Sequence, residues 1–266
     1  MTPEAFGAVL APLAERHAHW MSLRDDEVLD DRDEAAEDVR AMQLILRLER
    51  EQAPSWSSAL AAACTAATAI CLDERAAPGG AWHDPVAGYV RAHIRKVTRR
   101  ARAGQWQAVQ DLPGTTVTRR DAEVRALLPG PVTDLDKRVG KLQVGGTDLP
   151  VDLRAGDRPV APAGVLLLQL PAHIPMTAGK LMAQTGHAGM ITAALLSATD
   201  GGALQRWWAA GLPTTVALLT ERAWSAEHIL AGDAHAWEHR RVAVRDAGFT
   251  EIDPGTVTVI ADATGL

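Results

Sequence analysis

Two short apolar runs, each followed by a stretch of small residues, constrain the fold of this chain most. Residues 44–48 read LILRL and residues 166–170 read LLLQL. Each run has the length of a buried strand, and the alanine-rich stretch that follows it suits a tightly packed helix. The two segments align without a gap through the following helix. We therefore predict α/β architecture and a second half that repeats the first. The alternative is that any strand followed by an alanine-rich helix would align equally well.

The remaining sequence alternates between helix and strand patterns. The last two strands are separated by only a short loop, so we expect a mixed sheet with helices on both faces, in α/β/α layers. In the first half the predicted elements are a strand at 42–49, helices at 55–72 and 84–102, and a strand at 123–128. In the second half they are helices at 178–196, 204–210 and 225–239, and strands at 165–170, 214–219, 241–245 and 256–261.

Two domains fit a chain of 266 residues in which 47% are hydrophobic. The first 20 residues have the pattern of an amphipathic helix, and an acidic run follows them. The predicted divisions are an N-terminal helix with an acidic linker (1–38), a degenerate α/β domain that duplicates the later one (39–150), a linker (151–162) and a catalytic domain (163–266).

Charge is segregated along the chain. The net charge of −6 does not by itself indicate a nucleic-acid binder. Residues 25–38 hold nine acids and one arginine, whereas residues 84–102 hold six basic residues and one acid. On a helix the basic residues would form a stripe that could contact tRNA phosphates, and the alternative is a solvated helix face. The stripe consists of Arg91, Arg95, Arg99 and Arg102.

The two cysteines and the N-terminus indicate the cytoplasm. Cys64 and Cys71 are seven residues apart, and on a helix they would lie about 10 Å from each other, too far to bridge. We interpret them as small buried apolar residues in a reducing compartment. The N-terminus lacks the pattern of a secretion signal, and no apolar stretch is long enough to span a bilayer.

Three polar residues mark one face of the predicted helix 178–196. Lys180, Gln184 and His187 are spaced at i, i+4 and i+7, so they share that face near the start of the helix. A lysine in the first turn, where the helix dipole is already positive, favours an anionic ligand. The alternative is a solvated lysine, an exposed glutamine and a hydrogen-bonded core histidine.

A second polar segment follows the strand 241–245. Asp246 stands at the strand end, before Gly248 and a Pro254-Gly255 turn. Loops at strand ends are where open α/β sheets bind ligands, so Asp246 and Thr250 are candidate site residues. The alternative is an Asx turn beside ordinary strand residues.

Together the two segments resemble the archaeal and eukaryotic type of peptidyl-tRNA hydrolase, in an actinobacterial-like form with an extra N-terminal region. That family pairs a G-K-x-x-A-Q-x-x-H-A helix with a D-A-G-x-T-x-x-x-P-G-T loop. Here the first motif spans residues 179–188 and the second spans residues 246–256. The resemblance covers about residues 163–264.

The resemblance implies hydrolysis of the ester between a peptide and the 3′ ribose of tRNA, in translation and ribosome rescue. Asp246 or His187 would orient or deprotonate water, and Lys180 would neutralise the oxyanion or a phosphate. Peptidyl-tRNA is the implied partner, with no metal, organic cofactor or membrane. The implied substrate-binding residues are Gln184, Thr250, Gly255 and Thr256.

The chain also departs from the family pattern. Glu251 and Asp253 make the loop more acidic than in many relatives, which would repel tRNA. In the first half Ser58, Ala62 and Thr65 stand where the second has Lys180, Gln184 and His187, so that copy would lack the site. We expect a homodimer, or an intrachain pseudo-dimer in which the first half is the partner. The alternative function is a noncatalytic or regulatory tRNA-binding module.

Overall fold

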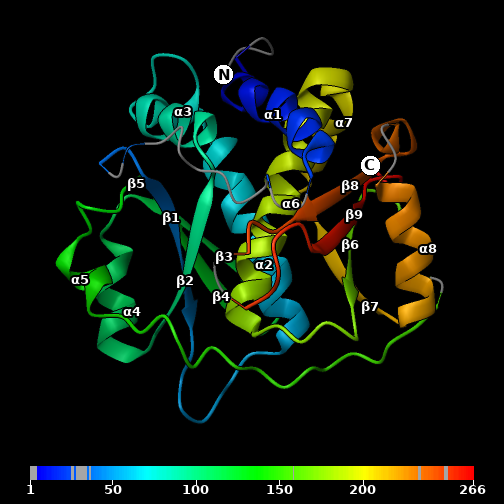
Figure 1. Ribbon diagram of the computed structural model, residues 1–266. Coiled ribbons are helices and arrows are strands. Elements are labelled where there is room, and N and C mark those ends of the chain that lie inside the picture. Colours follow the sequence, from blue (N-terminus) through cyan, green and yellow to red (C-terminus); the bar gives the residue numbers. More distant parts are fainter. Residues whose placement is uncertain are drawn as a thin grey trace.

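The computed structural model describes residues 5–24, 27, 35, 37–157, 159–232, 235–248 and 251–266. The chain forms two β-sheets with helices between and outside them (Figure 1). The predicted acidic linker falls largely outside the described residues. In the first half the strands are β1 (Arg40–Arg47), β2 (Arg95–Ala101), β3 (Gly114–Arg119), β4 (Ala122–Leu127) and β5 (Gly130–Pro131).

The second sheet is mixed, as the short loop between its last strands predicts. Its strand β6 runs parallel to β7 and antiparallel to β9, and β8 pairs antiparallel with β9. The six residues of β6 are all buried, in keeping with an apolar central strand. The strands are β6 (Leu166–Pro171), β7 (Thr214–Leu219), β8 (Arg241–Arg245) and β9 (Val257–Asp262).

The two sheets have the same strand order. The order is β2-β1-β4-β3 in the first half and β7-β6-β9-β8 in the second, with β5 added beside β1. Strand β1 is parallel to β2 and antiparallel to β4, and β6 is likewise parallel to β7 and antiparallel to β9. Leu44 pairs with Thr98 in the first sheet, and Leu166 pairs with Thr214 in the second. The two halves therefore share one strand order, and the duplication stays a prediction.

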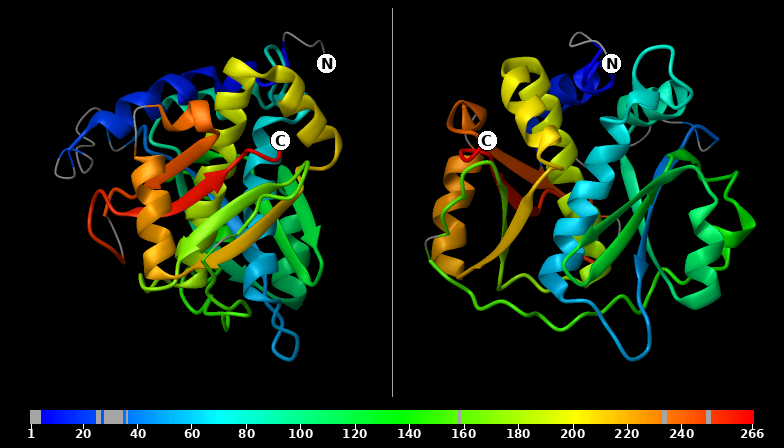
Figure 2. Two further views of the ribbon diagram at one scale, coloured as in Figure 1. Left: turned by 90° about the vertical axis from the view of Figure 1, so that its right-hand side faces the viewer. Right: turned by 180° about the vertical axis from the view of Figure 1, so that it is seen from behind.

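The helices form layers on both faces of each sheet. Helices α2 (Trp56–Cys71) and α6 (Ala178–Thr199) lie side by side between the sheets (Figure 2). Helices α4 (Ala103–Gln110) and α5 (Lys137–Gly140) cover the outer face of the first sheet, and α8 (Glu221–Ala231) covers that of the second. The predicted α/β/α layering is therefore confirmed. Further helices are α1 (Ala11–Ser22), α3 (His83–Arg91) and α7 (Gly201–Ala209).

Small residues bring α2 and α6 close together. A Cβ placed on Gly189 would lie 2.4 Å from Thr68 Oγ1 and 2.6 Å from Cys64 Sγ, so only glycine fits there. Cys64 and Cys71 are free and buried, as predicted. Leucines of β1 and β6 belong to one continuous apolar cluster, so the two halves share a core.

The predicted helix at residues 84–102 is correct only as far as Arg91. Helix α3 ends at Arg91, Ile94 adopts a left-handed φ of 46°, and β2 begins at Arg95. The tRNA-binding stripe predicted on that helix does not exist, because Arg95 and Arg99 lie on a strand and Arg102 precedes α4. The β-branched pair Val97 and Thr98 favours strand over helix.

Two other predicted segments differ in detail. The predicted helix at 225–239 is shorter: α8 ends at Ala231, and a separate 3₁₀ turn spans Ala236–His239. The segment predicted as a linker is extended, and Gly156 pairs with Leu219 at the edge of the second sheet.

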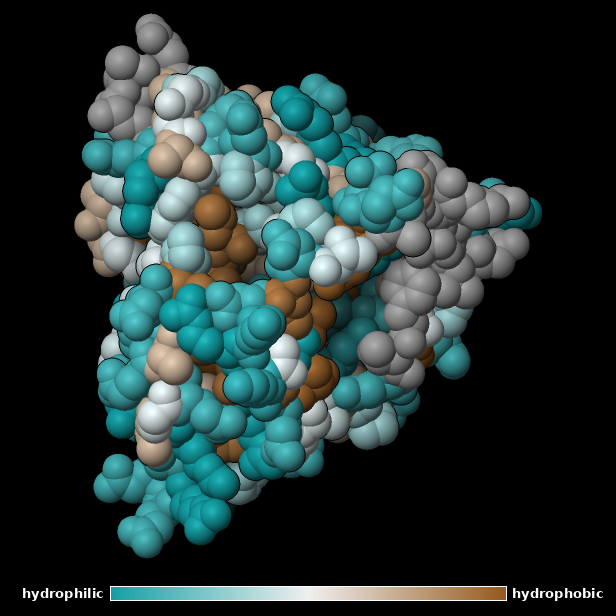
Figure 3. All heavy atoms as spheres, turned by 90° about the vertical axis from the view of Figure 1, so that its left-hand side faces the viewer, coloured by the Kyte–Doolittle hydropathy of each residue, from teal (hydrophilic) through white to brown (hydrophobic). Residues whose placement is uncertain are grey.

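Within the described residues, no helix is long and apolar enough to cross a membrane. On the face in Figure 3, apolar side chains gather in a central hollow and polar side chains surround it.

Candidate active site

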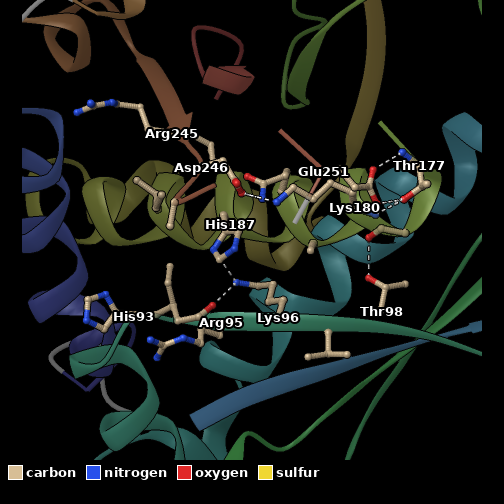
Figure 4. Close-up of a pocket in the computed structure, with 18 of the residues that line it drawn as sticks. His93, Arg95, Lys96, Thr98, Thr177, Lys180, His187, Arg245, Asp246 and Glu251 are labelled. Carbon is tan, nitrogen blue, oxygen red and sulfur yellow. Dashed lines mark hydrogen bonds and ion pairs between the residues drawn. The ribbon is translucent and has the colours of Figure 1, made fainter. Parts of the chain in front are cut away.

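A pocket of about 740 Å³ lies between the two halves of the chain. The C-terminal half forms one wall with α6 and the end of β8, and the N-terminal half forms the opposite wall with β2 and α1. Figure 4 shows Lys180, His187 and Asp246 on the first wall and Lys96 and Thr98 on the second. A pocket of this size suits a small molecule or the end of a larger one.

Helix α6 presents the three polar residues that its sequence places on one face. Thr177 caps the helix, accepting a hydrogen bond from the backbone of Lys180 at 3.2 Å. From this fixed start, Lys180, Gln184 and His187 all line the pocket. The spacing that grouped them in the sequence therefore groups them in space.

Asp246 is the centre of a hydrogen-bond network. Lys180 Nζ lies 2.5 Å from Asp246 Oδ2, and Gln184 Nε2 donates to the same oxygen at 2.7 Å. Both partners of the ion pair are largely buried, with 11% of the lysine side chain and 8% of the aspartate side chain exposed. The carboxylate is thus held by charge-assisted hydrogen bonds in a fixed orientation.

Thr258 fixes the orientation of Gln184. Its hydroxyl donates to Gln184 Oε1 at 2.8 Å, so the amide oxygen is occupied and the amide nitrogen faces Asp246. Both residues are buried. The sequence analysis did not identify Thr258, because its position in the threonine-rich strand β9 looks like that of any buried strand residue.

The loop after β8 provides a hydrogen bond to the second carboxylate oxygen of Asp246. Gly248 donates its backbone N–H to Asp246 Oδ1 at 2.8 Å and has a φ of 76°. A Cβ at Gly248 would lie 2.5 Å from the nitrogen of Pro254, so the turn requires glycine. The backbone of Asp246 is held in turn by Thr256 O at 2.9 Å and by the N–H of Gly255 at 2.8 Å.

Lys96 reaches the pocket from the N-terminal half. Its Nζ lies 3.2 Å from His187 Nδ1 and donates to the carbonyl oxygen of Ile94 at 3.4 Å. Burial lowers the pKa of Lys96 to about 7. The pKa of His187 lies well below its ordinary value, first because of burial and then because of the charges of Lys96 and Lys180. His187 is therefore a neutral imidazole at neutral pH.

Glu251 binds the start of α6. Its carboxylate accepts hydrogen bonds from Thr177 N at 2.8 Å and Thr177 Oγ1 at 2.7 Å. The loop is therefore tied to the helix N-terminus, where the dipole favours an anion. This carboxylate lines the pocket beside Lys180.

Other predicted site residues lie elsewhere. Thr256 Oγ1 donates to Asp253 O at 2.7 Å, and neither Gly255 nor Thr256 lines the pocket; both brace Asp246. Thr250 lies outside the described residues. Of the four predicted tRNA-contacting arginines only Arg95 lines the pocket, and Arg99 instead donates to Gln43 and Leu142 O.

The N-terminal half has a simpler arrangement at the comparable place. Asp121 follows β3 as Asp246 follows β8, and it accepts hydrogen bonds from Ser55 N at 2.9 Å and Ser55 Oγ at 2.8 Å. Ser58 Oγ lies 2.7 Å from Ser55 Oγ. No described lysine forms an ion pair with Asp121, so this half lacks a counterpart of the Lys180–Asp246 pair.

The comparison with protein families agrees with the resemblance inferred from the sequence. Residues 165–263 match the family model described as Peptidyl-tRNA hydrolase PTH2, which confirms that assignment for the C-terminal half. No curated protein and no solved structure matched the chain. All of the polar network around Asp246 lies within the matched residues.

Proposed function

We propose that this protein hydrolyses the ester bond of peptidyl-tRNA and releases free tRNA and a peptide. The observation that carries the proposal is the ion pair between Lys180 and Asp246, braced by Gln184 and Thr258 on one wall of the pocket. Such a pre-organised carboxylate and ammonium are the groups that acyl transfer to water requires.

In the proposed reaction, Asp246 orients a water molecule whose oxygen bonds to the ester carbonyl carbon. The water proton passes to the carboxylate and then to the ribose oxygen as the carbon–oxygen ester bond breaks. Lys180 stabilises the negative charge that develops on the carbonyl oxygen. His187 Nδ1 faces Lys96 Nζ at 3.2 Å, which leaves Asp246 in the role of base.

The charge of the pocket also supports an anionic substrate. The chain carries a net charge of −6, yet basic side chains predominate along the pocket wall. Phosphates at the 3′ end of a tRNA would be attracted to such a surface. The cationic lining residues are Arg16, Arg95, Lys96, Lys180 and Arg245, and the acidic ones are Asp148, Asp246 and Glu251.

The test is release of N-acetyl amino acid from N-acetyl-aminoacyl-tRNA by the wild type, Asp246→Asn and Asp121→Asn. We expect a kcat loss of about 100-fold or more for Asp246→Asn, because the base and the partner of Lys180 are both lost. Asp121→Asn is the matched control, since it changes an aspartate of the other half that lies outside the pocket lining. We expect its kcat to stay within about twofold.

Three outcomes would count against the proposal. Equal effects of the two variants would separate the activity from this site. Absence of turnover despite measurable tRNA binding by the wild type would favour the noncatalytic tRNA-binding module. Absence of both would exclude this substrate.

A further inference from the structure

The wall of the pocket formed by the N-terminal half places the ammonium group of Lys96 beside His187. Side chains alternate along β2, so Lys96 and Thr98 point toward α6, where Thr98 Oγ1 donates to Gly179 O at 2.8 Å. The lysine stem then crosses α6 at Gly186, where an added Cβ would lie 3.0 Å from Lys96 Cδ and Cε. A glycine one residue before His187 therefore makes room for a side chain of the other half.

The surroundings of Lys96 leave His187 as its main polar partner. The titratable groups near it are the thiols of Cys64 and Cys71 on α2, the Tyr89 ring on α3, and His187 on α6. Lys180 acts on His187 in turn. The thiols stay protonated because burial raises the pKa of each to about 12. The pKa of Tyr89 is raised well above its ordinary value by burial. No described carboxylate forms an ion pair with Lys96, whereas Lys180 is paired with Asp246.

The contact determines which nitrogen of His187 carries the proton. A protonated Lys96 has only donors, so Nδ1 must accept, and a neutral imidazole then carries its single proton on Nε2. His187 lines the pocket, and no described protein group bonds to its Nε2. Nε2–H is therefore available as a donor to a molecule in the pocket.

We propose that Lys96 is a positioning residue of this site, which holds the proton of His187 on Nε2 and makes the ring a hydrogen-bond donor to the reacting ester. The inference rests on the proposed hydrolase function and deepens it. It also gives the N-terminal half a role, because that half completes the site without bearing one of its own.

The protonation of Lys96 gives the proposal a pH dependence. As the pH rises through about 7, Lys96 loses its proton. Its neutral amine can then accept from Nδ1–H as well as donate, so the contact no longer holds the ring proton on Nε2 and the donor is weakened. We expect the kcat of the wild type to decline above about pH 7 for this reason.

The test compares Lys96→Met with Lys141→Met, which removes an exposed lysine of the same half. For Lys96→Met we expect a kcat loss of roughly 30-fold, a KM within about twofold, and no alkaline decline. The Tm should not fall, because methionine removes a partly buried cation and keeps the apolar stem. Lys141→Met should match the wild type in all of these measurements.

Nuclear magnetic resonance of ¹⁵N-labelled histidine reads the tautomer directly and requires no turnover. We expect Nε2–H at pH 6 and a shift toward Nδ1–H at pH 9 in the wild type, and no such shift in Lys96→Met. An Nδ1–H ring at pH 6, or identical tautomers in both proteins at both pH values, would overturn the proposal.

If the wild type shows the expected tautomers and lacks hydrolase activity, the proposed function fails while the coupling of Lys96 to His187 stands. If Lys96→Met changes the tautomer without changing kcat, the positioning role fails and the function stands.

Discussion

The two halves of this chain share a strand order, and they differ in the polar side chains of the helix that follows the first strand, α2 in one half and α6 in the other. In the C-terminal half, α6 carries Lys180, Gln184 and His187 into a pocket. In the N-terminal half, Thr65 on α2 instead donates to a backbone carbonyl, that of Leu212, at 3.2 Å. The scaffold therefore provides a place for a site, and the polar side chains decide whether chemistry follows.

The difference also shows what the N-terminal half contributes. Its β2 lies against α6 and supplies Lys96 and Thr98 to the pocket, and α1 closes another side. Arg245 ties the end of α1 to the site through the carbonyl oxygens of Trp20 and Leu23, each at 2.8 Å. Both halves therefore line the pocket and pack against each other around it.

Removing the hydroxyl that orients Gln184 should sharpen this contrast most. Thr258→Val keeps the volume of the side chain but leaves Gln184 Oε1 without its donor, so the amide can turn and stop donating to Asp246. We expect kcat to fall about tenfold, since one oriented hydrogen bond is worth roughly 1–1.5 kcal/mol. Steady-state kinetics on N-acetyl-aminoacyl-tRNA measures this.

Thr68→Val is the control for Thr258→Val. Thr68 is a buried threonine of α2, and its hydroxyl bonds to Cys64 O within its own helix at 2.8 Å. Its kcat should stay within about twofold of the wild type. A similar kcat loss in both variants would mean that general packing, and not the orientation of Gln184, limits the activity.

Much of the C-terminal half could be predicted from the sequence. The face of α6 follows from helical periodicity alone, and Asp246 follows from its place at a strand end. Both are local features, which a sequence displays directly. The approach of Lys180 to Asp246 across 66 residues depended on the family resemblance, because spacing says nothing about which loop meets which helix.

The N-terminal wall could not be predicted in the same way. Arginines at i, i+4 and i+8 gave residues 91–99 a helical pattern, and this pattern hid a strand whose pairing with β1 is non-local. The pair of Lys96 and His187 joins residues 91 positions apart and exists only because the two halves pack together. No local signal distinguishes Lys96 from the neighbouring basic residues.

Each half binds a carboxylate at the start of its central helix, and only one of these carboxylates lies beside the pocket. Glu251 binds Thr177, and Asp121 binds Ser55. Glu251→Gln removes a negative charge from the pocket lining, so we expect tRNA to bind about threefold more tightly at low salt and this gain to shrink as salt increases. Asp121→Asn should leave the affinity unchanged. Filter binding at two salt concentrations measures both, and equal affinities for Glu251→Gln and the wild type would exclude a repulsive role for Glu251.

A half-buried histidine on the N-terminal helix α1 makes the attachment of this helix sensitive to acid. Burial lowers the pKa of His17 to about 4, and its Nε2 is buried without a hydrogen-bond partner among the described residues. Because the folded pKa lies below the unfolded value of 6.5, the unfolded state binds the proton more readily. The stability that depends on neutral His17 is therefore complete above pH 6.5 and is lost as the pH falls toward 4. We expect a loss of roughly 2 kcal/mol across this range, or a few degrees in Tm.

His17→Leu should remove this part of the acid sensitivity, whereas His19→Gln, on the exposed side of the same helix, should retain it. Thermal melts of the three proteins between pH 4 and pH 7 measure the difference, and parallel curves for His17→Leu and the wild type would show that α1 is not the acid-sensitive part.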